Sequence, residues 1–323
     1  MIAGLSGSLL SHDAIAGAIA LLDPKVDEKA RAAAARELCI SHESAGAEMG
    51  PASSARAVFD RIAAPLAAAL GFRVTFAGGD AGGPGGQRLF RAVLEAAGAP
   101  AAALIATEWG REPAGAWRDA VRHGIGTRLR WCFCVTGPLL RVLDARRTYS
   151  RRFAEFDIDT TLHEPSTFAV FWGLLRAGAF PAGGAARLDR AVALSDQHRS
   201  EVRASLQSGV HEALTALVRA FGSARQGRRA PRPAPAILFG ESLVVIYRIL
   251  FLLFAEARGL VPNWHPIYRG SYTIEALRLP VETRLRPRGV WESVQAIARL
   301  AHGGCRAGTL QVPPFNGRLF SPA

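Results

Sequence analysis

Cysteine is scarce in this chain, and the few cysteines are not arranged as metal ligands. The sequence contains four, Cys39, Cys132, Cys134 and Cys305, and has no CxxC pair. A zinc ribbon needs such pairs, so their absence argues against one. Cys132 and Cys134 alternate along an apolar run and are expected to share one face of a strand. The N-terminus also lacks the layout of a secretory signal. We therefore predict free thiols and a cytoplasmic protein.

Lysine is nearly absent as well. Lys25 and Lys29 are the only lysines among 39 basic residues, so almost all the positive charge is arginine. The 27 acidic residues leave a net charge of +12. Arginine stays charged at any cellular pH and binds phosphate with a planar fork, so the excess favours a polyanionic partner. A general bias toward Ala, Gly, Arg and Pro explains the same count. A hydrophobic content of 49% with 20% charged residues indicates a folded chain.

The usual nucleotide-binding and acyl-transfer motifs are missing. The glycine-rich loop from Gly78 to Gly86 lies between a predicted strand and a predicted helix, where a nucleotide-binding turn belongs. It fits no GxGxxG pattern, because Arg88 occupies the place of the third glycine, and no GK[ST] follows. No GxSxG occurs. Pro313-Pro314-Phe315 is similar to the loop that holds a flipped adenine, but Val312 stands where an Asn or Asp must accept hydrogen bonds.

The first half of the chain predicts a helical segment followed by a small α/β domain. Residues 1–50 are expected to be a helical lead-in, with a helix at Asp27–Leu38 and a small-residue loop at His42–Ser54. Residues 51–160 alternate between helical and strand patterns, which favours an α/β fold. The predicted helices are Arg56–Leu70, Gln87–Ala97 and Pro113–His123, and the predicted strands are Phe72–Phe76, Ala101–Thr107, Leu129–Val135 and its hairpin partner Leu139–Asp144.

The second half predicts mainly helices. Residues 161–235 form a helical segment that ends in an arginine-rich linker, and residues 236–323 form a helical connector. Within the apolar run Ile237–Ala255, Glu241 and Arg248 would be costly in lipid, so we expect a buried helix and no membrane span. The tail Pro313–Ala323 is expected to be extended, without a closing element. The predicted helices are Ser166–Gly178, one or two within Leu188–Phe221, Ala236–Arg258 and Trp291–Ala301.

Several stretches carry a resemblance to a known family. The clearest is the helix YRILFLLFAEARGLVP at Tyr247–Pro262, followed by Ile267-Tyr268 and Ser271-Tyr272. The tail FNGRLF at Phe315–Phe320 is similar to an "NGGLF" segment, with Arg318 in place of a glycine. With weaker similarity at residues 131–143 and 153–158, the chain resembles the N-terminal region of type IIG (Eco57I-like) restriction–modification proteins. Related phage-defence adenine-specific DNA methyltransferases share these features.

The resemblance implies a nuclease-like first domain. In this family that domain is often a PD-(D/E)xK nuclease, whose chemistry needs two carboxylates for Mg²⁺ and a lysine beside the attacking water. Asp80 is the candidate for the first acid and metal ligand. A Glu-x-Lys should precede Trp109-Gly110, but Ile105-Ala106-Thr107 stands there. Glu108 and Glu95 are the nearby substitutes. We therefore expect a nuclease-like fold with a degenerate cleavage site, in which Asp80 and Glu108 are only weak catalytic candidates.

The resemblance also implies a methyltransferase domain that follows the position where this chain ends. Neither a glycine-rich cofactor turn nor an [Asn/Asp]-Pro-Pro-aromatic loop is present. S-adenosylmethionine and Mg²⁺ are therefore implied for the full-length family, and no cofactor is expected in this chain. A truncated gene and a split subunit are both open. Arg248 and Glu256 of the long helix are expected to make buried pairs at a domain junction.

Two clusters of arginine are candidates for DNA contact. Either could follow a phosphate backbone with salt-dependent and largely sequence-blind affinity, and either could be a solvated basic face. One cluster surrounds the predicted strand pair and the other lies in the linker. The candidates are Arg128, Arg130, Arg141, Arg146, Arg147, Arg151 and Arg152 in the first cluster, and Arg225, Arg228, Arg229 and Arg232 in the second.

The leading hypothesis is a DNA-binding N-terminal portion of a restriction–modification-type adenine-specific DNA methyltransferase, without catalysis of its own. A second hypothesis is a scaffold subunit of a phage-defence complex, in which the apolar helix around Phe251–Phe254 docks a separate methyltransferase. A third is a Mg²⁺-dependent DNA endonuclease whose active-site acid has migrated to Glu108.

Overall fold

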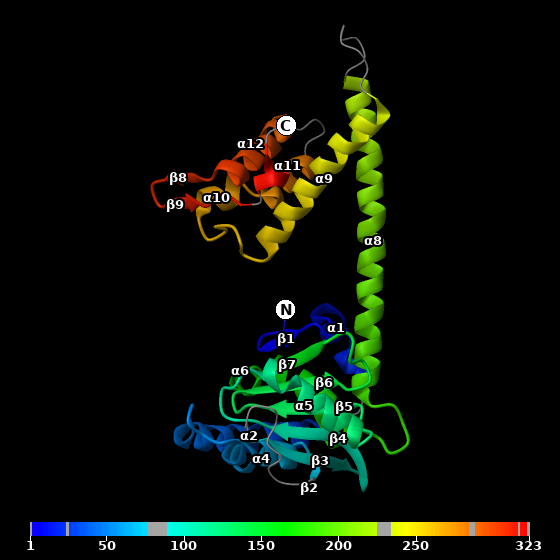
Figure 1. Cartoon of the computed structure of the whole chain (residues 1–323), viewed down its shortest axis with the longest axis vertical. Helices are drawn as coiled ribbons and strands as arrows, with labels where there is room; N and C mark the ends of the chain where they lie inside the picture. The colour runs from blue at the N-terminus through cyan, green and yellow to red at the C-terminus, as the bar shows by residue number, and fades with distance from the viewer. Residues whose placement is uncertain are drawn as a thin grey trace. The chain divides into compact units, whose positions relative to one another are not determined.

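A computed structural model describes residues 2–23, 26–76, 89–224, 234–283, 288–315 and 317–321. The chain divides into two compact units, Met1–Val202 and Arg203–Ala323, and helix α8 (Arg187–Ala224) crosses the boundary between them (Figure 1). The predicted mixed α/β class is confirmed, because a large mixed sheet is combined with many helices.

The first unit is built on a seven-stranded sheet with the order β1-β7-β6-β5-β4-β3-β2. Strands β4 and β5 are parallel and are connected through helix α5 (Pro113–Gly126), whereas every other pair of neighbours is antiparallel. The predicted strand pair Leu129–Val135 and Leu139–Asp144 is confirmed as the β5–β6 hairpin. The strands are β1 (Leu5–Gly7), β2 (Arg73–Phe76), β3 (Phe90–Ala96), β4 (Ala99–Ala106), β5 (Trp131–Val135), β6 (Leu139–Asp144) and β7 (Phe153–Asp157).

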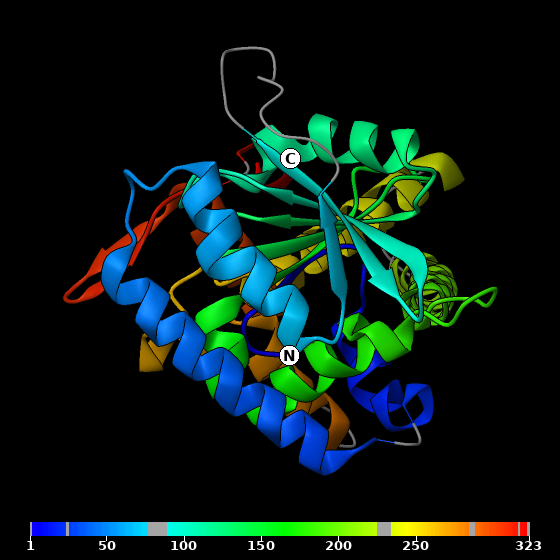
Figure 2. The ribbon, with the colours of Figure 1, turned by 90° about the horizontal axis from the view of Figure 1, so that it is seen from below.

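The two faces of this sheet are covered unequally. Figure 2 shows α5 on one face and α2 and α4 on the other. The second face carries the large core, which includes Phe133, Phe156 and Phe171. The helices that contribute to this core are α1 (His12–Leu22), α2 (Glu28–Glu48), the continuous helix α3–η1–α4 (Ala55–Val58, Phe59–Ala63 and Ala64–Ala69), α6 (Ile158–His163), α7 (Pro165–Leu175) with the short turn η2 (Ala177–Ala179), and the start of α8.

The α5 side holds a smaller core and both strand cysteines. Cys132 packs there with Ile105 and Ala120, and Cys134 shares its face because side chains alternate along β5. A Cβ at Gly124 would clash with the Cys132 sulfur, so glycine allows α5 to lie close to the strand. Burial raises the pKa of both thiols to about 12. All four cysteines of the chain are free, as predicted.

Three predictions for the first unit are wrong. The stretch predicted as a helix at Gln87–Ala97 contains strand β3, because from Phe90 onward it pairs with β2 and β4. The predicted loop at His42–Ser54 is helical as far as Glu48, where the buried Ala45 packs into the core. The lead-in is not purely helical, since Leu5–Gly7 forms an edge strand paired with β7. Pairing with neighbouring strands overrides local propensity in β1 and β3.

The second unit is helical with one small hairpin. Its two apolar clusters are centred on Leu252 with Phe320 and on Tyr268 with Val312. The predicted helices at Ala236–Arg258 and Trp291–Ala301 are confirmed as α9 and α12. The elements are the end of α8, α9 (Pro235–Ala257), α10 (Pro266–Ser271), α11 (Ile274–Thr283), α12 (Val290–Gly303), β8 (Cys305–Ala307), β9 (Leu310–Val312) and α13 (Gly317–Phe320).

Helix α9 is not the buried helix that its sequence predicts. It is long and apolar enough to cross a membrane, by length and composition, but only 17% of its most apolar window is buried. The prediction that Arg248 and Glu256 each make a buried pair at a domain junction is also corrected. Arg248 donates hydrogen bonds to the carbonyls of Leu319 and Ser321, at 2.8 and 2.9 Å. The carboxylate of Glu256 accepts the backbone N–H of Ile274 at the start of α11, at 2.6 Å.

The prediction of an extended tail is wrong, because α13 forms there and Phe320 is buried. Val312 is buried as well, and Phe315 stacks on Phe251. These side chains therefore build the core of the second unit, which agrees with the rejection of this segment as a base-holding loop.

Candidate nucleic-acid interface

Of the two residues predicted as weak candidates for a nuclease site, only Glu108 is among the described residues. Asp80 lies outside the described residues. Glu108 follows β4 and is exposed, whereas Ile105, Ala106 and Thr107 before it are fully buried. Nowhere in the described parts of the chain do three His, Cys, Asp or Glu side chains gather closely enough to hold a metal ion. The buried end of β4 therefore offers Mg²⁺ no ligand, and Glu108 alone does not make a site.

The seven predicted arginines around β5, β6 and β7 fall into two groups. Four of them are bound to carboxylates: Arg130, Arg141, Arg147 and Arg152. The other three, Arg128, Arg146 and Arg151, are exposed, and their side chains have no ion pair with any described residue. The four arginines predicted in the linker, at positions 225, 228, 229 and 232, lie outside the described residues.

Arg130 joins the sheet to the start of α8. It forms an ion pair at 2.8 Å with Asp144, at the end of β6, and a second with Asp189 in the first turn of α8. Its guanidinium lies 4.8 Å from the centre of the Trp131 ring. Since Asp144 is almost fully buried, this arginine is needed to neutralise it. Arg130 is therefore mainly a structural residue.

Asp196 of α8 collects three arginines. Arg147, Arg152 and Arg199 approach its two oxygens at 2.6, 2.8 and 2.7 Å. Partial burial alone would raise the pKa of Asp196, but hydrogen bonds from Arg199 and Arg147 outweigh it and lower the pKa to about 2. The carboxylate is therefore charged at neutral pH, and the cations around it are occupied.

Arg141 is the most buried of the seven, with only 7% of its surface exposed. It lies on the α5 side of β6, where it forms a 2.7 Å ion pair with Glu155 on the neighbouring β7. Its guanidinium is 3.9 Å from the centre of the Phe153 ring. Both the charge and the planar face of this arginine are thus in use.

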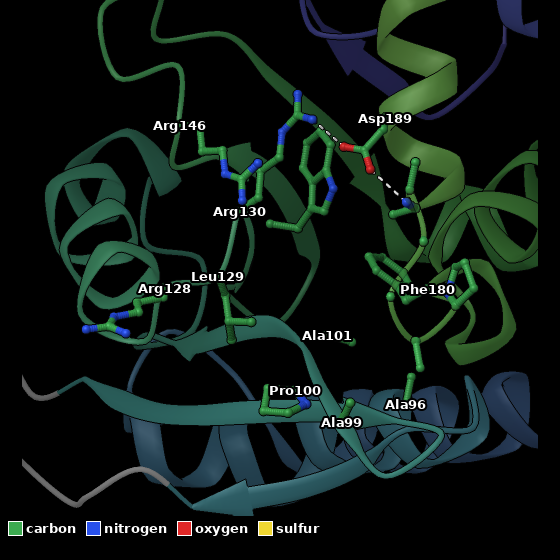
Figure 3. A pocket seen from close by; sticks show the side chains of 17 residues that line it. Ala96, Ala99, Pro100, Ala101, Arg128, Leu129, Arg130, Arg146, Phe180 and Asp189 are labelled. Atoms are coloured by element: carbon green, nitrogen blue, oxygen red, sulfur yellow. Dashed lines mark hydrogen bonds and ion pairs between the residues drawn. The ribbon is translucent and has the colours of Figure 1, made fainter.

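Arg128 and Arg146 lie at an open cleft of about 520 Å³. Figure 3 shows them on one side of this cleft, with Phe180 and Asp189 on the opposite side and the turn from β3 into β4, with Ala99 and Pro100, below. Arg128 has a φ of 59°, a left-handed conformation, at the turn between α5 and β5. The residues after Phe180, up to Ala186, line the rest of that wall.

Trp131 adds a polar group to the lining of this cleft. The ring is 2% exposed, and its Nε1 donor is buried without a hydrogen-bond partner among the described residues. A buried donor normally has a partner, because leaving it unpaired costs free energy. Two uncommitted guanidinium groups and an unpaired indole N–H are a donor set that suits an anionic oxygen. Sequence reasoning predicted the arginines but missed Trp131, which the pattern of β5 marks only as a core residue.

Comparisons with known proteins do not assign this arrangement: no family model, curated protein or solved structure matches the chain. What this site can bind must therefore be inferred from the chemistry of its own residues.

Proposed function

We propose that this chain is a DNA-binding module, the N-terminal portion of a restriction–modification-type adenine-specific DNA methyltransferase, without catalysis of its own. The observation that carries DNA binding is the cleft at Arg128 and Arg146, where two exposed guanidinium groups and the Trp131 N–H have no partner among the described residues. Contacts of this kind bind phosphate without reading the bases, so they supply affinity and position more than specificity.

Assignment to the restriction–modification class is supported by the sequence resemblance at Tyr247–Pro262. The lack of catalysis is supported by β4, because the position where the family's Glu-x-Lys is expected carries Ile105-Ala106-Thr107, all buried. A buried apolar strand end gives no attacking water its base or lysine. We therefore favour a binding role over an endonuclease that uses Glu108.

A salt series tests this proposal. The full chain is titrated into a labelled mixed-sequence DNA duplex, and binding is followed by fluorescence anisotropy at increasing NaCl. We expect the logarithm of the affinity to fall linearly and steeply with the logarithm of salt concentration, since bound arginines release counterions from the phosphates. Absence of binding at low salt would contradict the proposal. The same preparation should transfer no methyl group from S-adenosylmethionine and should not nick DNA with Mg²⁺.

One observation favours the second candidate, a scaffold that docks a separate methyltransferase. Helix α9 presents a series of large apolar side chains to solvent, each with between 38% and 54% of its surface exposed: Ile237, Phe239, Val244, Tyr247, Leu253 and Phe254. Exposed apolar patches of this kind are typical of protein interfaces. A methyltransferase encoded next to this chain that copurifies with it, and is lost with Phe254→Asp, would favour this candidate.

A further inference from the structure

A second cleft, of about 530 Å³, lies beside α5 in the first unit. Helix α5 contributes Trp117 and Arg118, strand β6 contributes Arg141, and the start of β7 contributes Phe153, with Arg151 just before it. A volume of this size is typical of a site for a small ligand. The cleft differs from that at Arg128 and Arg146 because aromatic rings and arginines line it together.

Positive charge dominates this second cleft. Arg118 and Arg151 are exposed, and neither forms an ion pair with a described residue. Arg141 is paired with Glu155, the only carboxylate that binds a lining arginine within the described structure. The cleft therefore holds at least two cations that none of the described acids neutralises, which favours an anionic ligand.

A third uncommitted arginine lies directly behind the cleft wall. Arg111 places its Nη2 atom 3.3 Å from the position that a Cβ would take at Gly115, a residue that lines the cleft. Its Nη1 atom is buried and has no hydrogen-bond partner among the described residues. A buried guanidinium nitrogen without a partner is costly, and the charge of Arg111 close behind the wall adds to the positive potential of the cleft.

The aromatic rings extend the ligand chemistry beyond a simple anion. The Arg151 guanidinium lies 5.5 Å from the centre of the Trp117 ring, and that of Arg141 lies 3.9 Å from the centre of Phe153. Aromatic rings offer stacking surfaces to a planar base, while the exposed Arg118 and Arg151 attract phosphate. A duplex keeps its bases stacked inside the helix, so such a pair of features suits a nucleotide whose base is free.

We propose that this cleft binds an unpaired nucleotide, with the base against Trp117 and Phe153 and the phosphate near Arg118 and Arg151. The inference deepens the proposed DNA-binding function and rests on it for the source of that nucleotide. A nucleotide within single-stranded DNA and a free mononucleotide share the same chemistry, and the experiment below separates them.

The test uses the full chain with three ligands: an oligothymidylate of about ten nucleotides, thymidine 5′-monophosphate, and a blunt duplex. Intrinsic tryptophan fluorescence and anisotropy are both recorded. We expect the oligomer to quench fluorescence, and the quench to decrease in Trp117→Leu with about a tenfold loss of affinity, the size of one lost stacking contact. Trp264→Leu is the matched control, because Trp264 is 71% exposed and lies in the other unit.

A second variant keeps the proposal falsifiable if Trp117→Leu weakens folding. Arg118→Ala combined with Arg151→Ala removes only exposed side chains and should lower oligomer affinity by about tenfold, because two phosphate contacts are lost. Arg122→Ala is its control. Arg122 is exposed on the same helix, but it pairs with Asp119 and does not line the cleft.

The outcomes separate the cleft from the proposed function. Unchanged oligomer binding in both cleft variants would overturn the proposal that this cleft binds a nucleotide. If duplex binding persists at the same time, the proposed DNA-binding function stays in place. Quenching by the mononucleotide without binding of either DNA form keeps the nucleotide site and overturns the proposed function. Binding of the oligomer much more tightly than the mononucleotide, with both cleft variants impaired, supports single-stranded DNA as the source.

Discussion

The arginines of the first unit differ in whether an acid binds them, even where they line the same cleft. Around the start of α8, Asp144, Asp189 and Asp196 hold arginines that tie this helix to the sheet. At the two clefts, Arg128 with Arg146 and Arg118 with Arg151 have no acidic partner among the described residues. In composition these arginines are equivalent. Only the second group is available to a ligand, so the charge that matters for binding is smaller and more localised than the net charge suggests.

The largest expected effect comes from removing a paired arginine. Arg141→Ala leaves Glu155, whose side chain is 14% exposed, without its cation and removes the contact with Phe153. Breaking a largely buried pair in this way should lower the free energy of unfolding by about 3 kcal/mol. Urea denaturation measures this change. Arg61→Ala, at the exposed pair with Glu48, should cost less than about 0.5 kcal/mol. Equal losses in the two variants would contradict the division into two groups.

A smaller effect is expected at Asp196, and it should depend on pH. Asp196→Asn weakens three contacts that are about a third exposed, so we expect a loss of roughly 1 to 2 kcal/mol at pH 7. The pKa of Asp196 is about 2 in the folded chain, compared with an ordinary value of 3.8 for an aspartate in the unfolded chain. A depressed pKa stabilises the fold above the unfolded value and loses its effect as pH falls toward the folded value.

The difference in stability between the wild type and Asp196→Asn should therefore be constant above pH 5 and decrease between about pH 4 and pH 2. Chemical denaturation at a series of pH values measures it. Asp159→Asn is the control, because Asp159 is exposed and, among the described residues, its carboxylate forms an ion pair only with His163. A difference that does not change with pH would show that the carboxylate charge does not stabilise the fold.

The sequence predicts some strands and not others for a physical reason. The pair β5–β6 is local, and the turn at Thr136-Gly137-Pro138 lies between two apolar runs. The sequence pattern therefore predicts this hairpin directly. Gly137 has a φ of 89°, and a Cβ there would overlap the ring of Trp109. Strand β3 also forms a local hairpin, with β4 across Ala97-Gly98, but its helix-forming residues hide that hairpin, so local propensity predicts it wrongly.

The sequence predicts that the candidate site contains arginine, but not which of the arginines are free to bind a ligand. Arg130 and Arg147 were counted with Arg128 and Arg146, because all four lie near the same strand pair. Their acidic partners on α8 are 59 and 49 residues away in sequence, and no local pattern shows that the fold brings them together. The second cleft was missed for a similar reason, since Trp117 and Phe153 belong to different elements that meet only in the folded sheet.

The most direct test of the account compares the salt dependence of duplex binding in the wild type and in Arg128→Ala combined with Arg146→Ala. Arg56→Ala combined with Arg61→Ala removes the same charge from two exposed arginines of the same unit and serves as the matched control. We predict that the cleft variant keeps wild-type stability within about 0.5 kcal/mol, binds more weakly, and has a salt slope smaller by about 2, one for each lost phosphate contact. The control should keep the wild-type slope. Equal slopes in the two variants would contradict the account, because binding would then depend on net charge and not on the cleft.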